Sequence, residues 1–221
     1  MKKTFITLLA LAGIAMGEPY LFDFKGSQIT SSSQKSITLG NPGEIQLDAT
    51  STGNLSSGSW ETLTWYDIEG HMNEAEVEEW TGISDLSAAA QDYIMSNGST
   101  TLTLTYTGLT AGASYDVCVI GGGYAHTSSG QWGTWSCPNE YTTEITSANI
   151  PAKAIGTIAL SDVVADQNGE IVVQFTASAF HKVTLSAATI QFVSAPPVPE
   201  PATATLSLLA LAGLAARRRR A

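Results

Sequence analysis

The sequence predicts an all-β protein: a two-sheet antiparallel sandwich of jelly-roll type with one short helix, flanked by an apolar helical segment at each end. Three observations support this fold class. Short segments of alternating apolar and polar residues recur along the chain, clusters of Gly, Ser, Thr and Asn separate them, and one internal segment has helical spacing. Strands and turns in this rhythm are typical of β-sandwiches.

The predicted strands are short and lie between residues 20 and 192. The run 51–59, rich in Ser and Gly, is expected to be a loop. Apolar residues at helical spacing after Ser84 predict a helix over Ser84–Ser96. The strands are expected at Tyr20–Phe24, Ser36–Leu39, Glu44–Leu47, Glu61–Ile68, Thr101–Thr107, Tyr115–Ile120, Gln131–Cys137, Thr157–Leu160, Ile171–Phe175 and Val183–Phe192.

Two strand pairs are predicted from the turns. Thr101–Thr107, with leucines on one face and threonines on the other, should pair with Tyr115–Ile120 through the turn Thr110–Ala113. Tyr115–Ile120 and Gln131–Cys137 flank a turn-rich stretch, as two strands of a hairpin would.

The two cysteines of the chain, Cys118 and Cys137, lie in this predicted hairpin. We expect them to form a disulfide, which would stabilise the fold by roughly 3 kcal/mol in the chain-entropy model. The alternative is two unpaired buried thiols. Two cysteines supply only two of the four ligands of a structural zinc site, and no matching histidine cluster supplies the others, so a zinc site is not expected.

Residues 1–17 have the features of a secretory signal peptide. A positive start, Met1-Lys2-Lys3, precedes the apolar run Phe5–Met16, and Ala15-Met16-Gly17 offers small residues for cleavage. We therefore expect export through the Sec translocon and cleavage by signal peptidase after Gly17.

Residues 195–221 form a distinct tail. Pro199-Glu200-Pro201 precedes an uncharged span, Ala202–Ala216, and four arginines, Arg217, Arg218, Arg219 and Arg220. Fifteen helical residues span only about 22 Å, less than the roughly 30 Å of a bilayer core, so the helix should anchor marginally in the inner membrane. The arginines favour the cytoplasmic face. A plain tail anchor is the less favoured interpretation of this arrangement.

The order and spacing of these three parts resemble the PEP-CTERM sorting signal of exported bacterial proteins. The resemblance implies recognition by an exosortase and cleavage near Pro199-Glu200-Pro201. The protein would be anchored transiently and then pass to the cell surface or an extracellular polysaccharide matrix.

Residues 18–194 are long enough for one domain with a sizeable core. Six of the ten basic residues lie in the two ends, so residues 18–198 keep four, against 19 of the 20 acidic residues, a net charge of −15. This charge excludes a nucleic-acid partner, which needs a basic surface. It also favours neutral over anionic glycans as ligands.

The domain further resembles the jelly-roll, galactose-binding-like sandwiches found ahead of PEP-CTERM tails. The resemblance rests on Leu21–Phe24, on Gly108–Val117 and on Asp166–Ile171. The second of these segments is also similar to a turn of fibronectin type III modules, so an immunoglobulin-like sandwich is the alternative. The size of the domain favours the jelly roll.

Aromatic residues around the Gly121–Gly130 stretch suggest a sugar-binding site, because exposed aromatic rings beside polar groups can hold sugars. The alternative is core packing of the tryptophans. The candidate binding residues are Tyr124, His126, Trp132 and Trp135.

A cluster of carboxylates between tryptophans could in principle hydrolyse glycosides. We interpret its glutamates as a solvated loop. Asp166, Asn168 and Glu170 are better explained by a turn than by calcium binding, and no nucleophile motif is present, so we expect neither catalysis nor a metal or cofactor. The cluster comprises Asp67, Glu69, His71, Glu74, Glu76, Glu78 and Glu79, with Trp60, Trp65 and Trp80.

The expected function is therefore that of a non-catalytic surface or matrix protein that contacts neutral polysaccharide. Two alternatives remain. One is a glycoside-processing enzyme, and the other is a protein that binds ice or another lattice through the outward residues Thr101, Thr103, Thr105 and Thr107.

Overall fold

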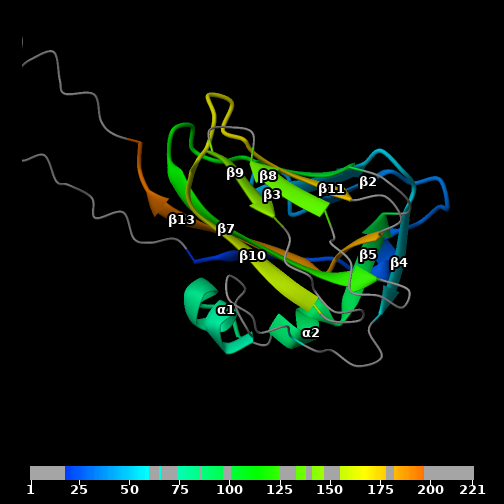
Figure 1. The fold of residues 1–221 in the computed structure, drawn as a ribbon. Coiled ribbons are helices and arrows are strands. Elements are labelled where there is room, and N and C mark those ends of the chain that lie inside the picture. Colours follow the sequence, from blue (N-terminus) through cyan, green and yellow to red (C-terminus); the bar gives the residue numbers. More distant parts are fainter. Residues whose placement is uncertain are drawn as a thin grey trace, which may run out of the picture.

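The computed structural model describes residues 18–59, 65, 74–84, 86–96, 101–124, 133–137, 141–146, 155–177 and 182–196. Within them, two antiparallel sheets lie face to face, and this confirms the predicted jelly-roll sandwich (Figure 1). The proposed signal peptide and membrane helix lie outside these residues. Among the residues described, no helix has the length and apolar character needed to span a membrane.

The first sheet has seven strands in the described part of the chain. Its order is β1 (Tyr20–Asp23), β13 (Ala187–Ser194), β7 (Ser114–Tyr124), β12 (Lys182–Leu185), β5 (Asp92–Ser96) and β4 (Leu55–Ser59), and β10 (Ile155–Val164) also pairs with β7.

The second sheet has six strands in the same described residues. Its order is β2 (Ser36–Leu39), β3 (Gln46–Ser51), β6 (Thr101–Thr107), β11 (Ile171–Ala177), β8 (Gly133–Cys137) and β9 (Tyr141–Thr146).

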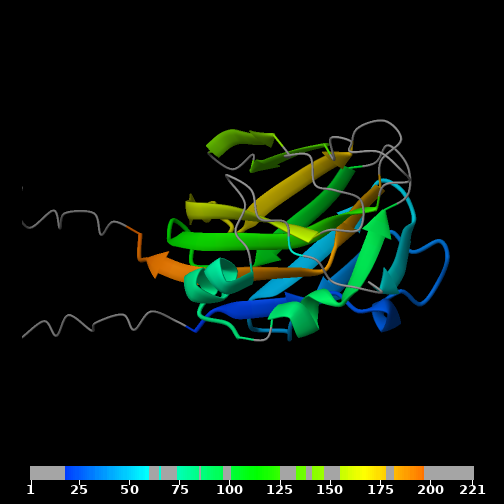
Figure 2. The same ribbon diagram turned by 60° about the horizontal axis from the view of Figure 1, so that its bottom comes forward.

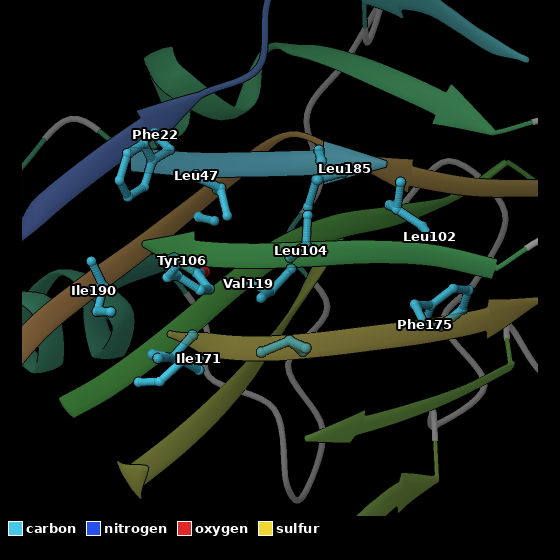
Figure 3. Packing of buried hydrophobic residues seen from close by; sticks show 14 of the residues in the cluster. Phe22, Leu47, Leu102, Leu104, Tyr106, Val119, Ile171, Phe175, Leu185 and Ile190 are labelled. Atoms are coloured by element: carbon cyan, nitrogen blue, oxygen red, sulfur yellow. The ribbon is translucent and has the colours of Figure 1, made fainter. Parts of the chain in front are cut away.

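The main core fills the space between the sheets (Figure 3). On β6 the burial alternates as predicted, with Leu102, Leu104 and Tyr106 buried and the threonines turned outward. The ring of Tyr106 meets that of Phe22, from the other sheet, edge to face at a centroid distance of 5.9 Å. Period-two alternation thus builds one apolar layer between two sheets.

A second apolar cluster lies on the outer face of the seven-stranded sheet, beneath α1 (Glu74–Thr81) and α2 (Leu86–Ala90) (Figures 1 and 2). Val77 and Leu86 of the helices pack there with Cys118 and Ile120 of β7. Because both faces of this sheet are covered, β7 is buried almost continuously from Tyr115 to Gly121.

The predicted pairing of Thr101–Thr107 with Tyr115–Ile120 is wrong. β6 pairs with β3 and β11, whereas β7 pairs with β10, β12 and β13 in the other sheet. The turn between them closes as predicted, with the Ala113 N–H donating to the Thr110 carbonyl oxygen at 3.0 Å, but it carries the chain across the sandwich. Alternation predicts that one face of a strand is buried. It does not predict which sheet the strand joins, because the strands of both sheets bury one face in the same core.

The predicted hairpin of Tyr115–Ile120 with Gln131–Cys137 is also wrong, since β8 pairs with β9 and β11 in the second sheet. Cys118 is a buried, free cysteine, and the expected bridge to Cys137 is therefore not formed in this structure. Val117 and Val119 face the inter-sheet core, so strand alternation turns Cys118 toward the helices and away from the second sheet.

Local signals misassigned several other segments. The predicted helix Ser84–Ser96 is helical only in α2, and Asp92–Ser96 forms β5, which pairs with β4 inside the expected loop 51–59. Gly58 makes this pairing possible, because a Cβ there would lie 2.5 Å from the Tyr93 hydroxyl oxygen.

Two further segments differ from the prediction, and a third was not predicted. The glutamates expected in a loop belong to α1, β9 was not expected, and the last strand is interrupted at Ser186 between β12 and β13. Of the expected strand Glu61–Ile68, Trp65 alone lies within the described residues, where it bridges to Ile155.

The η1 turn (Gly26–Gln28) follows β1. Its residues join β1 to the polar loop that precedes β2.

Candidate functional site

The outer face of strands β2, β3, β6 and β11 is rich in hydroxyl and amide side chains, and we name this surface the polar face. These side chains alternate with the buried row on each strand and are exposed or half-buried. The polar face comprises Ser36 and Thr38 of β2, Gln46, Asp48 and Thr50 of β3, Thr101, Thr103, Thr105 and Thr107 of β6, and Gln174 of β11.

Strand register aligns these residues in rows across the sheet. One row runs from Ser36 through Thr50 and Thr103 to Gln174, and the register continues it to Ser136 of β8. Neighbouring members of a row are about 4.8 Å apart across the strands, and alternate residues along one strand are roughly 6.7 Å apart. The result is a regular grid of small polar groups.

A second row contains Thr38, Asp48 and Thr105, and it ends at the apolar Val172. The Thr38 hydroxyl donates to the Asp48 carboxylate, which is the one carboxylate among the described side chains of the polar face. These side chains include no lysine or arginine. Hydroxyl and amide groups both donate and accept hydrogen bonds, so the face is chemically suited to neutral hydroxylated ligands.

The aromatic candidates are placed only in part. Tyr124 ends β7 opposite Lys182, and Trp135 lies in β8 opposite Phe175. The backbone of Trp135 thus lies in register with Phe175, which is buried together with its other register partner, Leu102. His126 and Trp132 lie outside the described residues, and their role in binding stays a prediction.

The carboxylate candidates are spread along α1. Glu76 and Glu79 are exposed, and a Glu78 carboxylate oxygen accepts the Leu86 N–H at 3.4 Å, which joins α1 to the start of α2. Asp67, Glu69 and His71 lie outside the described residues.

The tryptophans near these carboxylates pack in the helical layer. Trp65 donates from Nε1 to the Ser87 hydroxyl at 3.0 Å, and both Trp65 and Trp80 pack against the cluster beneath the helices. Trp60 lies outside the described residues. The side chains that the structure places here therefore form a packed layer and a solvated helix face.

The Asp166–Gly169 turn is present as predicted. One Asp166 carboxylate oxygen accepts the N–H groups of Asn168 and Glu170, each at 2.8 Å, and Gly169 has a positive φ of 74°. The Asp166 carboxylate thus accepts hydrogen bonds from the backbone of its own turn. Across the described residues, no three His, Cys, Asp or Glu side chains come close enough together to hold a metal ion.

Fold and surface together define an acidic β-sandwich with a broad polar sheet face. Residues 197–220 match the PEP-CTERM protein-sorting motif, a match that includes Pro199, Glu200, Pro201 and Arg217–Arg220. The protein is therefore an exported protein whose C-terminal tail directs exosortase processing. No curated protein matches the sequence.

Two solved structures show weak similarity to the fold. The CBM36-1 domain of a multidomain xylanase from the hindgut metagenome of Trinervitermes trinervoides aligns over 66% of this chain and 100% of that domain, with 9% identity and a TM-score of 0.33. A family two carbohydrate esterase from Cellvibrio japonicus aligns over 68% of this chain and 38% of its own, with 16% identity and a TM-score of 0.29.

Proposed function

We propose that this protein is a non-catalytic component of the cell surface or extracellular matrix, and that it contacts neutral polysaccharide. The observation that carries the proposal is the polar face, where four adjacent strands present hydroxyl and amide groups in register. A polysaccharide presents hydroxyl groups at regular intervals, which such a grid can meet by hydrogen bonds made one sugar after another.

The negative charge of the domain favours neutral over anionic sugars as ligands. The segment 18–198 carries a net charge of −15, and Asp48 lies within the polar face. An anionic glycan would be repelled by this surface unless cations bridged the two. Export by the sorting system supports the proposal, because it delivers the domain to the side of the membrane where such polysaccharides are found.

Hydrogen bonds to sugars contribute little net free energy each, because sugar and protein both give up bonds to water. Binding would therefore depend on many weak contacts along a long chain. We expect low affinity for short oligosaccharides and stronger retention on polymers, where several sites can be occupied at once.

The test measures glycan-array binding and reducing-sugar release with the same preparation of the exported protein. Thr103→Arg places a long charged side chain at the centre of the polar face, and we expect it to weaken polymer binding about tenfold or more, the effect of losing roughly 1.4 kcal/mol. Thr110→Arg is the matched control, because Thr110 is an exposed threonine on a turn outside the polar face.

Two further variants separate the other interpretations. Loss of binding in Trp132→Ala but not in Thr103→Arg would move the site to the aromatic stretch. Sugar release that Glu76→Gln abolishes would replace the proposal with an enzyme. Thermal hysteresis lost in Thr103→Arg, without glycan binding, would show a lattice-binding surface, and a protein silent in every assay would contradict the proposed contact.

A further inference from the structure

The end of the last strand connects the domain to its sorting tail. β13 runs antiparallel to β1, and Tyr20 lies opposite Ile190, so the start of β1 and the end of β13 are at the same end of the sandwich (Figures 1 and 2). Both processed segments of the chain are therefore attached at this end.

Phe192 anchors the strand here. Its ring meets that of Tyr115 edge to face, with centroids 5.7 Å apart and planes at 82°. The Tyr115 hydroxyl oxygen in turn accepts the Thr110 N–H at 2.9 Å. The anchor is thus continuous with the 108–113 turn and with the main core.

Beyond Phe192 the attachment becomes weaker but persists. The register of β13 on β7 shifts between Phe192 and Ser194, and Ser194 then pairs with Ser114. Two residues later Pro196 lies on Gly112, where a Cβ added to the glycine would be 3.2 Å from the Pro196 Cβ.

The turn beneath Pro196 is held firmly. The Gly112 N–H donates to the Ala165 carbonyl oxygen at 2.9 Å, and the Leu109 N–H donates to that of Gly169 at 3.1 Å. Gly112 has a φ of 73°, in the left-handed region that favours glycine. Pro196 therefore docks on a fixed element that is bonded to the 165–170 turn.

The sorting motif follows almost immediately. Two residues, Pro197 and Val198, separate Pro196 from Pro199, and three steps of extended chain span about 10 Å at most. The tail on the other side of the motif continues into the uncharged span and the arginines. The processing site thus lies between a folded domain and the segment expected in the membrane, with little free chain on the domain side.

We propose that the folded domain restrains its own exosortase processing, and that residues 193–196 must detach from Ser114 and Gly112 before the motif can enter the active site of the enzyme. Cleavage breaks one backbone peptide bond near the Pro-Glu-Pro sequence. The carbonyl carbon on the domain side passes to water or another acceptor nucleophile, and the tail leaves with a free amine.

Detachment is a local opening. It loses the register-shifted pair at Ser194 and the contact of Pro196 with Gly112, whereas the Phe192–Tyr115 contact marks the point at which the opening stops. The exosortase would then cleave only the minority of molecules in which this end is open. The rate of processing would depend on the fraction of molecules in which this end of β13 is released.

A linker series in the full-length precursor, expressed in an exosortase-containing host, tests the restraint. Inserting a Gly-Ser linker of about eight residues between Pro196 and Pro197 adds flexible chain without changing the domain or the motif. We expect the initial rate of processing to rise about threefold to tenfold, as removal of an opening cost of roughly 0.6 to 1.4 kcal/mol would give. The same insert after Ser32, in an exposed loop, is the control.

A disulfide lock gives the converse test. Ser114→Cys with Ser194→Cys joins register partners at the detaching end, whereas Ser59→Cys with Asp92→Cys joins register partners of β4 and β5, near the opposite edge of the same sheet. We expect the first lock to stop processing until a reductant is added, and the control lock to leave it unchanged. Peptide mapping verifies each bridge.

Combining the Ser114–Ser194 lock with the linker completes the design. The linker should restore processing although the lock remains closed, because it supplies free chain beyond the locked residues. Equal processing rates in parent and linker precursor, or unhindered cleavage of the locked precursor without the linker, would overturn the proposal.

Discussion

Cys118 shows how the environment of one side chain follows from strand alternation. Its neighbours Val117 and Val119 face the second sheet, so the thiol lies on the opposite side, beneath the helices. Full burial removes water from the thiol and raises its pKa from the ordinary value of 9.0 to about 12, because the thiolate loses its hydration.

The raised pKa leads to a prediction about stability in alkali. Between about pH 9 and 12 the unfolded chain loses the Cys118 proton and the folded chain keeps it. The folded state then binds more protons, so the free energy of unfolding falls as pH rises, by up to about 1.4 kcal/mol per pH unit from this group. Cys118→Ala should remove this slope, as measured by denaturant unfolding at pH 9.5 and 10.5.

Cys137→Ala is the matched control, because it retains the Cys118 thiol and should keep the steeper slope. The same pair of variants examines the disulfide that the sequence suggested. If the exported protein contained the bridge, the parent would have no free Cys118 thiol and would lack the slope, whereas Cys137→Ala would free the thiol and show it.

At the scale of elements, α1 acts as a cover for the seven-stranded sheet. Val77 and Thr81, one helical turn apart, are its buried residues, and the Thr81 hydroxyl donates to the Val77 carbonyl oxygen at 2.7 Å. The glutamates occupy the remaining faces. A helix with so few apolar residues depends on this contact for its stability, because short isolated helices are marginal in water.

Val77→Ala is therefore expected to lower the free energy of unfolding by about 2 kcal/mol, through two lost methyl groups and the cavity left beneath the helix. Glu76→Ala removes an exposed neighbour and should change it by less than about 0.5 kcal/mol. Denaturant unfolding of both variants measures the difference. Equal, small effects would mean that α1 contributes little to holding the sheet.

At the scale of the whole molecule, the C-terminal tail directs the export processing of the protein. The sorting motif occupies residues 197–220, shortly after β13 ends at Ser194, and the domain carries its first and last strands side by side. We expect the protein recovered from its native host to begin at Glu18 and to end near Pro199-Glu200-Pro201.

Intact mass measurement checks this expectation. The mature mass should lack residues 1–17 and Arg217–Arg220, whereas a precursor with Pro199→Ala, Glu200→Ala and Pro201→Ala should retain its tail. A native protein that still carried the four arginines would show that the tail serves as a permanent anchor.

The sequence alone determined the features that depend on local order. The sorting motif lies in contiguous residues and is recognisable from its three parts. The all-β class, the Asp166–Gly169 turn and the two faces of Thr101–Thr107 also follow from local chemistry, because alternation and turn geometry are properties of a few neighbouring residues. The threonine row of the polar face could be seen in the same way.

The tertiary structure alone decided which strands are partners. β6 and β7 each direct alternate apolar residues into the same core yet belong to different sheets. Asp92–Ser96 is a strand because β4 and β12 lie beside it, although its local spacing also fits a helix. The polar face becomes a surface only when register brings β2, β3, β6 and β11 together. Strand pairing depends on contacts between segments that are distant in the sequence. The free energy of these contacts comes from burial across the whole core, so the local sequence pattern does not reveal which strands will pair.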